Sequence, residues 1–532
     1  MTVSRRHALQ AALAGAALAT PAAAAPRPGT GIEGQRKADR GDGRYVNPIV
    51  PGDHADPTIL KDGADYWMTF SSFQSYPGAV IWHSTDLVNW TPVTAALTQP
   101  IGTVWAMDLI KHAGRYYLYI PVLNDAGTGI YVIHADDIRG PWSAPIDLKI
   151  PGCIDPGHVV GEDGRRYLFV NGGRRVRLTA DGLATDGPLE DKAWTPWQYP
   201  KDWVVEMFAP EGPKLLRRGE WFYLISAVGG TAGPPTSHMV TVARSRSVHG
   251  PWEHAPNNPI VRTTSAGEPW WSRGHASVVE GPSGDPGDWW MVYHGYENGF
   301  RTLGRQALLE PVEWTQDGWL RAKGGTLDRP LPAPRGGKAG PAGVALSDDF
   351  SRNRMGVQWT FHAPGPDELS RLQWQDRSLL MRGKGKSLAD CSPLVCITGD
   401  RSYECSVELE ITSHDNTGHG GLGLFYDERG HVGIAFSTTQ LLTYGYGQEH
   451  TWMRENLATR KVHIRLTNRE NVVTFRFSRD DGRTWVQHPW QMEVSGLHHN
   501  VFGGFVSLRI ALFSAGAGEV RARNFVYRGL PT

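Results

Sequence analysis

A polar turn followed by an apolar strand recurs five times along the first part of the chain. Each copy has a glycine in the turn, an aromatic residue three positions later, and an apolar run around it. The copies are DGADYWMTF, HAGRYYLYI, EDGRRYLFV, RRGEWFYLI and PGDWWMVYH. Their glycines recur at intervals of roughly 50 to 70 residues, about the length of chain that a blade of four short strands requires. This periodicity predicts a five-bladed β-propeller.

An ionisable residue precedes the glycine of every copy at nearly the same phase. In a propeller, the strand at that phase is the innermost strand of its blade, so these side chains are expected to converge on the central axis. The five residues are Asp56, Asp108, Asp155, Glu211 and His275.

Beyond the repeats, the pattern changes to alternating apolar and polar positions, with turns about every ten residues. This alternation predicts a β-sandwich of the jelly-roll type. Between the two patterns, the stretch RPLPAPRGGKAGPAG has neither strand nor helix periodicity. We therefore predict an all-β protein with a propeller domain at 45–331, a linker at 332–343 and a sandwich domain at 344–532.

The N-terminal residues carry the features of an export signal. Arg5 and Arg6 precede a weakly hydrophobic Ala/Leu run, and Ala22 to Ala25 supply small residues for cleavage. We predict a twin-arginine-type signal peptide at 1–25 and a flexible lead-in at 26–44, hence a periplasmic or extracellular protein. No other segment reaches the length of a membrane span.

Composition and charge narrow the class of partner. The chain has 54 Lys plus Arg and 54 Asp plus Glu, so no basic excess points to nucleic acid or to an anionic membrane. A neutral partner is expected, and the 21 tryptophans include candidates for stacking on sugar rings. The four cysteines allow three connectivities. We expect a disulfide among Cys391, Cys396 and Cys405, with Cys153 left free.

Three of the axial carboxylates lie in strings that resemble the motifs of glycoside hydrolase family 43. These strings are HADPTIL at Asp56, CIDPGHVV at Asp155 and FAPEGP at Glu211. Three further stretches are similar to that family's pattern: WAMDL at Trp105 and Asp108, GHASVV at His275, and LGRQALLEPVEW at Arg305. The second domain, which opens with LSDDFSRNRMGVQW, resembles the concanavalin-like sandwich often attached to such enzymes.

The resemblance implies an inverting glycoside hydrolase. In such enzymes, one carboxylate activates a water molecule while a carboxylic acid on the other face of the sugar protonates the departing oxygen. By similarity, Asp56 is the general base and Glu211 the general acid. Asp155 is expected to raise the pKa of Glu211 through the proximity of a like charge and to orient it.

The resemblance also implies the surroundings of these carboxylates. Trp105, Asp108, Phe208 and Arg305 are expected to bind the substrate, and His275 to approach a structural calcium ion through water. No cofactor is expected for catalysis, and no protein partner is implied.

The expected substrate is a neutral oligo- or polysaccharide of plant origin. We expect exo action that releases arabinose or xylose, as an α-L-arabinofuranosidase or a β-xylosidase. Endo-arabinanase and exo-galactanase activity remain open. A non-catalytic sugar-binding propeller is a further alternative, although such a protein has no need of opposed carboxylates.

Overall fold

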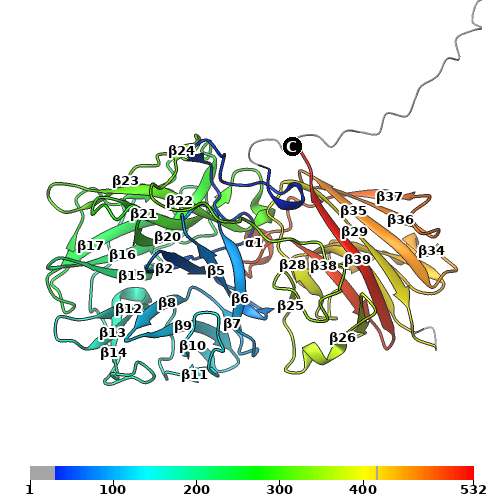
Figure 1. The fold of residues 1–532 in the computed structure, drawn as a ribbon, viewed down its shortest axis with the longest axis horizontal. Coiled ribbons are helices and arrows are strands. Elements are labelled where there is room, and N and C mark those ends of the chain that lie inside the picture. Colours follow the sequence, from blue (N-terminus) through cyan, green and yellow to red (C-terminus); the bar gives the residue numbers. More distant parts are fainter. Residues whose placement is uncertain (1–29, 415–416, 532) are drawn as a thin grey trace, which may run out of the picture.

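The protein consists of two β-domains, seen side by side in Figure 1, with the propeller on the left and the sandwich on the right. A computed structural model describes residues 30–414 and 417–531. The predicted signal peptide and residues 26–29 of the predicted lead-in lie outside the described residues. Within those ranges, no helix has the length and apolar character needed to cross a membrane. The predicted all-β fold, a five-bladed propeller followed by a sandwich, is confirmed.

Each blade of the propeller is an antiparallel sheet whose strands follow one another in sequence. The third blade has three strands, whereas the others have four or five. Blade 1 comprises β2 (Thr58–Asp62), β3 (Asp65–Thr69), β5 (Gly78–Ser84) and β6 (Thr91–Leu97). Blade 2 comprises β7 (Thr103–Val104), β8 (Asp108–His112), β9 (Arg115–Asn124), β10 (Gly127–Ala135) and β11 (Ile146–Asp147). Blade 3 comprises β12 (Gly157–Val160), β13 (Arg166–Val170) and β14 (Arg174–Leu178).

Blades 4 and 5 complete the ring. Blade 4 comprises β15 (Glu211–Arg218), β16 (Trp221–Val228), β17 (Met239–Ser245), β18 (Glu253–His254) and β19 (Val261–Arg262). Blade 5 comprises β20 (Trp270–Glu280), β21 (Trp289–Glu297), β22 (Arg305–Trp314) and β23 (Leu320–Ala322). The inner strands contact one another in the order β2, β8, β12, β15, β20 and back to β2. These five strands therefore lie next to the central axis.

The cores of the propeller lie between neighbouring blades. Separate clusters of buried apolar side chains fill the spaces between blades 1 and 2, 2 and 3, 3 and 4, 4 and 5, and 5 and 1. A central strand of a blade is thus covered on both faces, which explains its continuous apolar sequence. All nine residues of β21, WWMVYHGYE, are buried.

The second domain consists of two packed sheets. One comprises β26 (Leu372–Gln375), β27 (Ser378–Arg382), β39 (Glu519–Gly529), β29 (Ser402–Ile411), β35 (Lys461–Arg469), β36 (Val472–Ser478) and β37 (Val486–Glu493). The other comprises β33 (Gln448–Glu449), β32 (Gln440–Gly445), β31 (His431–Phe436), β30 (His419–Phe425), β38 (Arg509–Ala515), β28 (Leu394–Cys396) and β25 (Thr360–His362), with β34 (Glu455–Asn456) at its edge. Alternate residues of β29 are buried, as expected for a strand with one face on the core.

The two domains share a β-sheet and a hydrophobic core. Strand β4 (Ser75–Tyr76), which follows β3 in the propeller sequence, pairs with β25 and so adds an edge strand to the sandwich sheet. The largest core cluster contains the propeller residues Ala55 and Phe73 together with sandwich side chains. The short helix α1 (His499–Phe502) lies between the domains in Figure 1. The part of blade 1 that carries Ala55, Phe73 and β4 is therefore packed against the sandwich.

Short segments complete the described chain. Strand β1 (Arg44–Tyr45) pairs with β24 (Leu331–Pro332), which joins the two ends of the propeller sequence. The 3-10 helices are η1 (Ile32–Gly34), η2 (Asn171–Gly173), η3 (Arg301–Leu303), η4 (Glu368–Arg371) and η5 (Thr451–Met453). Within residues 30–44, Arg36 forms an ion pair with Glu297 at 2.8 Å. This segment is therefore tied to blade 5.

The expected disulfide is not formed. Cys391, Cys396 and Cys405 are buried and free, as is Cys153. Cys396 lies in β28 and Cys405 in β29, which belong to opposite sheets of the sandwich. These thiols pack in the core as small apolar groups instead of cross-linking it.

Candidate active site

The five ionisable residues predicted from the repeat phase all lie on or directly before the inner strand of their blades. Asp56 precedes β2 and Asp155 precedes β12, while Asp108 and Glu211 begin β8 and β15 and His275 lies within β20. Asp56, Asp155 and His275 have φ values of 56°, 56° and 60°. This left-handed conformation is costly for residues other than glycine and is concentrated at functional sites.

Asp56 is a buried carboxylate surrounded by donors. Ser71 Oγ donates to Oδ2 at 2.6 Å, and Arg305 Nη1 donates to Oδ1 at 2.9 Å. Burial alone would raise the pKa of Asp56, but the charge of Arg305 and contacts with His275 and His294 hold it well below its usual value. Asp56 is therefore ionised at neutral pH.

Glu211 has the opposite protonation preference. Burial, followed by the charges of Asp155 and Asp56, raises its pKa well above the usual value. Burial and the charge of Asp56 also raise the pKa of Asp155, to about 7. Asp155 Oδ2 accepts a hydrogen bond from Gly212 N at 3.0 Å and so fixes the backbone next to Glu211. Of the Glu211 side chain, 21% is exposed, against 6% for Asp56.

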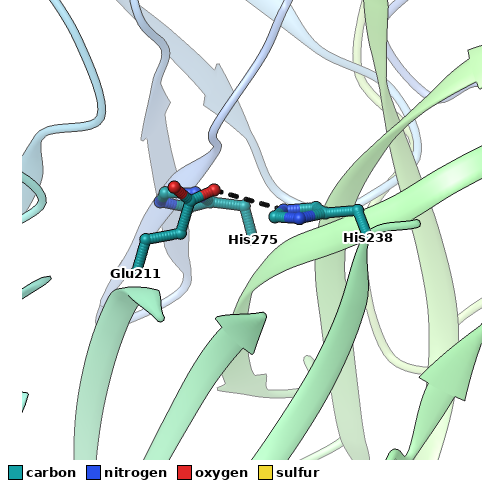
Figure 2. Close-up of side chains that lie close together, drawn as sticks. All are labelled: Glu211, His238 and His275. Atoms are coloured by element: carbon teal, nitrogen blue, oxygen red, sulfur yellow. Dashed lines mark ion pairs between the residues drawn. The ribbon is translucent and has the colours of Figure 1, made fainter. Parts of the chain in front are cut away.

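Three histidines form a group beside these carboxylates. The rings of His238 and His294 are parallel within 2°, with centroids 5.2 Å apart, and the ring of His275 lies 6.0 Å from that of His294. His238 Nε2 lies 3.7 Å from Glu211 Oε1, the contact drawn in Figure 2. Burial lowers the pKa of all three imidazoles, which keeps them neutral.

Glu211, His238 and His275 also bring three metal-ligating atoms within 4.8 Å of one another. Both ring nitrogens of His238 and Nε2 of His275 have no hydrogen-bond partner in the described part of the chain. Calcium prefers six to eight oxygen ligands. Two imidazoles and one carboxylate are instead a donor set for a transition metal. These residues therefore do not fit direct ligation of calcium, and the expected approach of His275 to a calcium ion through water stays a prediction.

Arg305, which we expected to bind the substrate, lies beside Asp56. It begins β22, is buried, and holds the carboxylate of Asp56. Its guanidinium carbon lies 5.7 Å from the ring centroid of Phe73 and 5.2 Å from that of Phe505. Phe505 belongs to the sandwich, so both domains contact the group that pairs with Asp56.

Asp108 lies in a buried ion pair. Its Oδ1 accepts a hydrogen bond from Lys214 Nζ at 2.9 Å, and its Oδ2 accepts one from His158 N at 2.7 Å. The carboxylate therefore links the inner strands of blades 2, 3 and 4. Its expected contact with the substrate stays a prediction.

The two predicted aromatic contacts lie in different environments. Trp105 is half-buried and packs against the core cluster that the sandwich shares with the propeller. Phe208 is 46% exposed, and its ring lies 6.1 Å from that of Tyr199. Phe208 remains open to a ligand, whereas Trp105 helps to join the domains.

Sequence reasoning missed several residues of the site. Some of them lie in or next to the sequence repeat, whereas others lie outside any motif. His294 ends the fifth copy of the repeat, and Ser71 follows the first copy closely, so the repeat itself points to both. Lys214 lies three positions after Glu211. His238 and Phe505 lie outside any motif, and only the folded chain brings them to the site.

The fold and the pair of carboxyls with opposite protonation preference define a propeller glycosidase. The model described as "Glycosyl hydrolases family 43" matches residues 45–320, and that of the "Beta xylosidase C-terminal Concanavalin A-like domain" matches residues 347–526. The chain belongs to glycoside hydrolase family 43, and it is a glycoside hydrolase.

Known proteins resemble both domains together. The chain is 26% identical over 512 residues to the "Non-reducing end alpha-L-arabinofuranosidase BoGH43B" of Bacteroides ovatus, covering 89% of this chain and 92% of that protein. It is 28% identical over 438 residues to the "Xylan 1,3-beta-xylosidase" of a Vibrio species, covering 74% and 79%. The crystal structure of a xylan beta-1,4-xylosidase from Bacillus halodurans superposes with a TM-score of 0.79 at 25% identity, covering 91% and 99%.

Proposed function

We propose that the protein is an exo-acting, inverting glycosidase that releases terminal arabinofuranose or xylose from plant polysaccharide fragments. One observation carries this proposal: Asp56 is held ionised and Glu211 is held protonated within one site. Inversion needs this division of protonation states. The names of the relatives support a pentose substrate. The contact of Phe505 with Arg305 places the sandwich against one side of the site, which supports a pocket closed on that side and hence exo action.

In the proposed reaction, Asp56 accepts a proton from water as the water oxygen attacks the anomeric carbon. Arg305 and Ser71 hold the carboxylate in place, so its basic lone pair is fixed in direction before the substrate binds. Arg305 keeps Asp56 ionised, but its charge also makes the carboxylate a weaker base. Substrate binding therefore has to position the attacking water closely.

On the other face of the sugar, Glu211 gives its proton to the glycosidic oxygen as the bond to the anomeric carbon breaks. Burial, and after it the charge of Asp155, keeps that proton on Glu211 until the leaving group develops negative charge. The hydrogen bond from Gly212 N to Asp155 Oδ2 fixes the Asp155 carboxyl relative to the backbone that carries Glu211. The products are the free sugar with inverted anomeric configuration and the shortened acceptor. No step requires a metal or another cofactor.

The assignment is tested with a panel of nitrophenyl glycosides followed by proton NMR of the first product. We expect turnover of the β-xyloside, the α-L-arabinofuranoside or both, with the opposite anomer formed first. A first product that retains the anomeric configuration would overturn the water-activation scheme. Binding of pentosides without any turnover would instead establish a non-catalytic sugar-binding propeller.

We further propose that the protein is exported and meets a neutral polysaccharide outside the cytoplasm, without a nucleic-acid or protein partner. The paired Arg5 and Arg6 before a weakly hydrophobic run support export, and the equal numbers of acidic and basic residues support a neutral partner. Fractionation of the native host tests export. Replacing both arginines by lysine should retain the protein in the cytoplasm.

A further inference from the structure

Four aromatic side chains form a group on the surface of the sandwich, which we call the aromatic patch. They are Tyr446, between β32 and β33, His450 and Trp452, at η5, and Trp490, in β37. Strand β32 lies near the opposite edge of its sheet from the propeller strand β4. Strands β34 and β37 lie on the side of the sandwich away from the propeller in Figure 1. The patch is therefore separate from the candidate active site.

Trp452 gives the patch its exposed surface. Of the 21 tryptophans, all of which belong to the described residues, Trp452 alone is largely exposed, at 77%. Tyr446 is 46% exposed, and Trp490 is half-buried. Exposed aromatic rings that gather at one place are typical of a binding surface, because water is a poor solvent for them.

The rings are held in place by the chain beneath them. A Cβ added at Gly445 would lie 2.6 Å from the ring of Trp490 and 3.0 Å from Nε2 of His450, so both rings pack directly on this glycine. Tyr446 Oη donates a hydrogen bond to the carbonyl oxygen of Glu493 at 3.0 Å. A surface that is ordered in advance loses little conformational entropy when a ligand binds.

The charge beside the rings favours a neutral ligand. Arg454, the basic residue next to Trp452 in the chain, has its Nε 2.7 Å from Glu449 Oε1. This ion pair neutralises the basic charge. Aromatic surfaces that bind anionic lipids instead carry lysine and arginine side chains whose charges are available. The patch therefore suits a neutral partner.

The size of the patch favours a small occupant over a second copy of the chain. Three large aromatic side chains would offer at most about 750 Å² even if each were fully exposed. A stable interface buries roughly 800 Å² on each partner. A sugar chain needs less, because the C–H face of a single sugar unit packs on one aromatic ring.

The inclination of the rings narrows the ligand further. The ring planes of Trp452 and Trp490 are inclined by 46°, with centroids 6.4 Å apart. Two rings at this angle cannot both lie flat on the planar face of a crystalline polysaccharide. They can contact successive units of a single twisted chain.

We propose that the aromatic patch is a second carbohydrate-binding site, which holds the enzyme on a single chain of a neutral polysaccharide. Sugar rings lie on Trp452 and Trp490, and Tyr446 extends the surface. The class of ligand rests on the proposed function. The proposal gives the sandwich a binding role of its own, in addition to its contact with Arg305.

Affinity electrophoresis of the full chain, in gels that contain soluble xylan or arabinan, tests the binding. We expect retardation in at least one of these gels, and it should persist in excess free xylose or arabinose, which competes for the candidate active site. Microcrystalline cellulose should not retain the protein. No retardation, its loss in free pentose, or equal binding to the cellulose would overturn the proposal.

Variants locate the binding surface. Trp452→Ala should weaken binding to the polysaccharide about two- to tenfold, the usual effect of one aromatic contact. Its midpoint of thermal unfolding should stay unchanged, because the indole is largely exposed. Trp452→Tyr should keep most of the affinity, because it keeps a ring. No loss of affinity in Trp452→Ala would contradict the assignment.

Trp485→Ala is the matched control. Trp485 also belongs to the sandwich, but its ring centroid lies 4.2 Å from the guanidinium carbon of Arg465, outside the patch. The control should bind the polysaccharide as the unaltered protein does. Equal losses in Trp452→Ala and Trp485→Ala would overturn the proposal.

The outcomes separate this proposal from the proposed function. Retardation that depends on Trp452, in a protein that turns over no pentoside, would support the second site and overturn the proposed function. Turnover of pentosides without retardation would do the reverse. Sedimentation velocity tests self-association, and a dimer that Trp452→Ala dissociates would assign the patch to a second copy and overturn the proposal.

Discussion

The difference in protonation between Asp56 and Glu211 is a property of single side chains, and single substitutions test it. Glu211→Gln removes the proton that the departing oxygen needs. We expect hydrolysis of xylo- or arabino-oligosaccharides to fall by about 10²- to 10⁴-fold, the usual contribution of general acid catalysis. Aryl glycosides with good leaving groups should keep much of their rate, as measured by kcat/KM for both substrate types. Equal losses on both would remove Glu211 from the role of acid.

Asp56→Asn provides the matched comparison for that experiment. The asparagine keeps the shape of the side chain but cannot accept a proton from water. Both substrate types should therefore lose activity together, because activation of water does not depend on the leaving group. The ratio of the two rates, measured in both variants, separates the base from the acid.

Asp155 should act on the pH profile through its charge. In the unaltered protein, burial and then the charge of Asp155 raise the pKa of Glu211, so the acid stays protonated and active to higher pH. Asp155→Asn removes that charge, so the alkaline limb of kcat/KM should move to lower pH while the acid limb, set by Asp56, stays in place. Glu206→Gln should move the alkaline limb less, because Glu206 is a weaker cause of the same shift. An unmoved alkaline limb in Asp155→Asn would contradict this electrostatic role.

The chemistry of the histidine group gives a prediction about metals. Incubation with EDTA should leave kcat unchanged, since the proposed reaction routes no step through a metal. Zinc should inhibit instead, because Glu211, His238 and His275 offer it a carboxylate and two imidazoles. Steady-state rates with EDTA, calcium and zinc distinguish these cases. A loss of activity with EDTA that calcium restores would contradict the prediction, because it would show that the enzyme requires calcium.

At the scale of elements, the backbone that presents Glu211 is itself constrained. Gly212 has a φ of 58°, and a Cβ added there would lie 2.9 Å from the ring of His275. Gly219, in the turn that follows β15, has a φ of 60° but has open space around it. The two glycines therefore share one backbone conformation and differ in what surrounds them.

This pair forms a matched test. Gly219→Ala should cost about 1 kcal/mol of stability, from the left-handed backbone alone. Gly212→Ala should cost more and should also lower kcat, because the new methyl group displaces His275 or Glu211. Urea unfolding and aryl glycoside kinetics measure the two effects. Equal costs and equal activity in the two variants would mean that the contact between Gly212 and His275 carries no constraint.

The sequence predicted the positions of the strands better than the contacts that their side chains make. The five repeats located the inner strands, and the phase argument placed Asp56, Asp155 and Glu211 correctly at their starts. The spacing measures only the length of chain per blade, so it did not predict that the third blade has three strands and that 180–210 contain no strand. Asp108 shares the same phase, yet its partner Lys214 lies on another blade, and a linear pattern carries no sign of that pairing.

At the scale of the whole molecule, the sandwich acts as part of the active-site wall. Phe505 contacts Arg305 although 200 residues separate them, and no local motif marks Phe505. Leu508 N donates to the carbonyl oxygen of Thr302 at 2.8 Å, and Thr302 Oγ1 donates to Asn471 Oδ1 at 2.8 Å. These contacts lie beside Arg305. A small displacement of the sandwich relative to the propeller would therefore move Arg305 and the Asp56 carboxylate that it binds.

The shared sheet and shared core predict that the two domains unfold together. Phe222 lies in the core between blades 3 and 4, a cluster that contains no residue of the sandwich. Phe222→Ala should destabilise the protein by about 3 to 5 kcal/mol. If the domains are coupled through β4, Ala55 and Phe73, differential scanning calorimetry should show one transition in both proteins, shifted to lower temperature as a whole in the variant. A scan that splits, with the sandwich transition left in place, would show instead that the propeller unfolds alone and that the interface contributes little to stability.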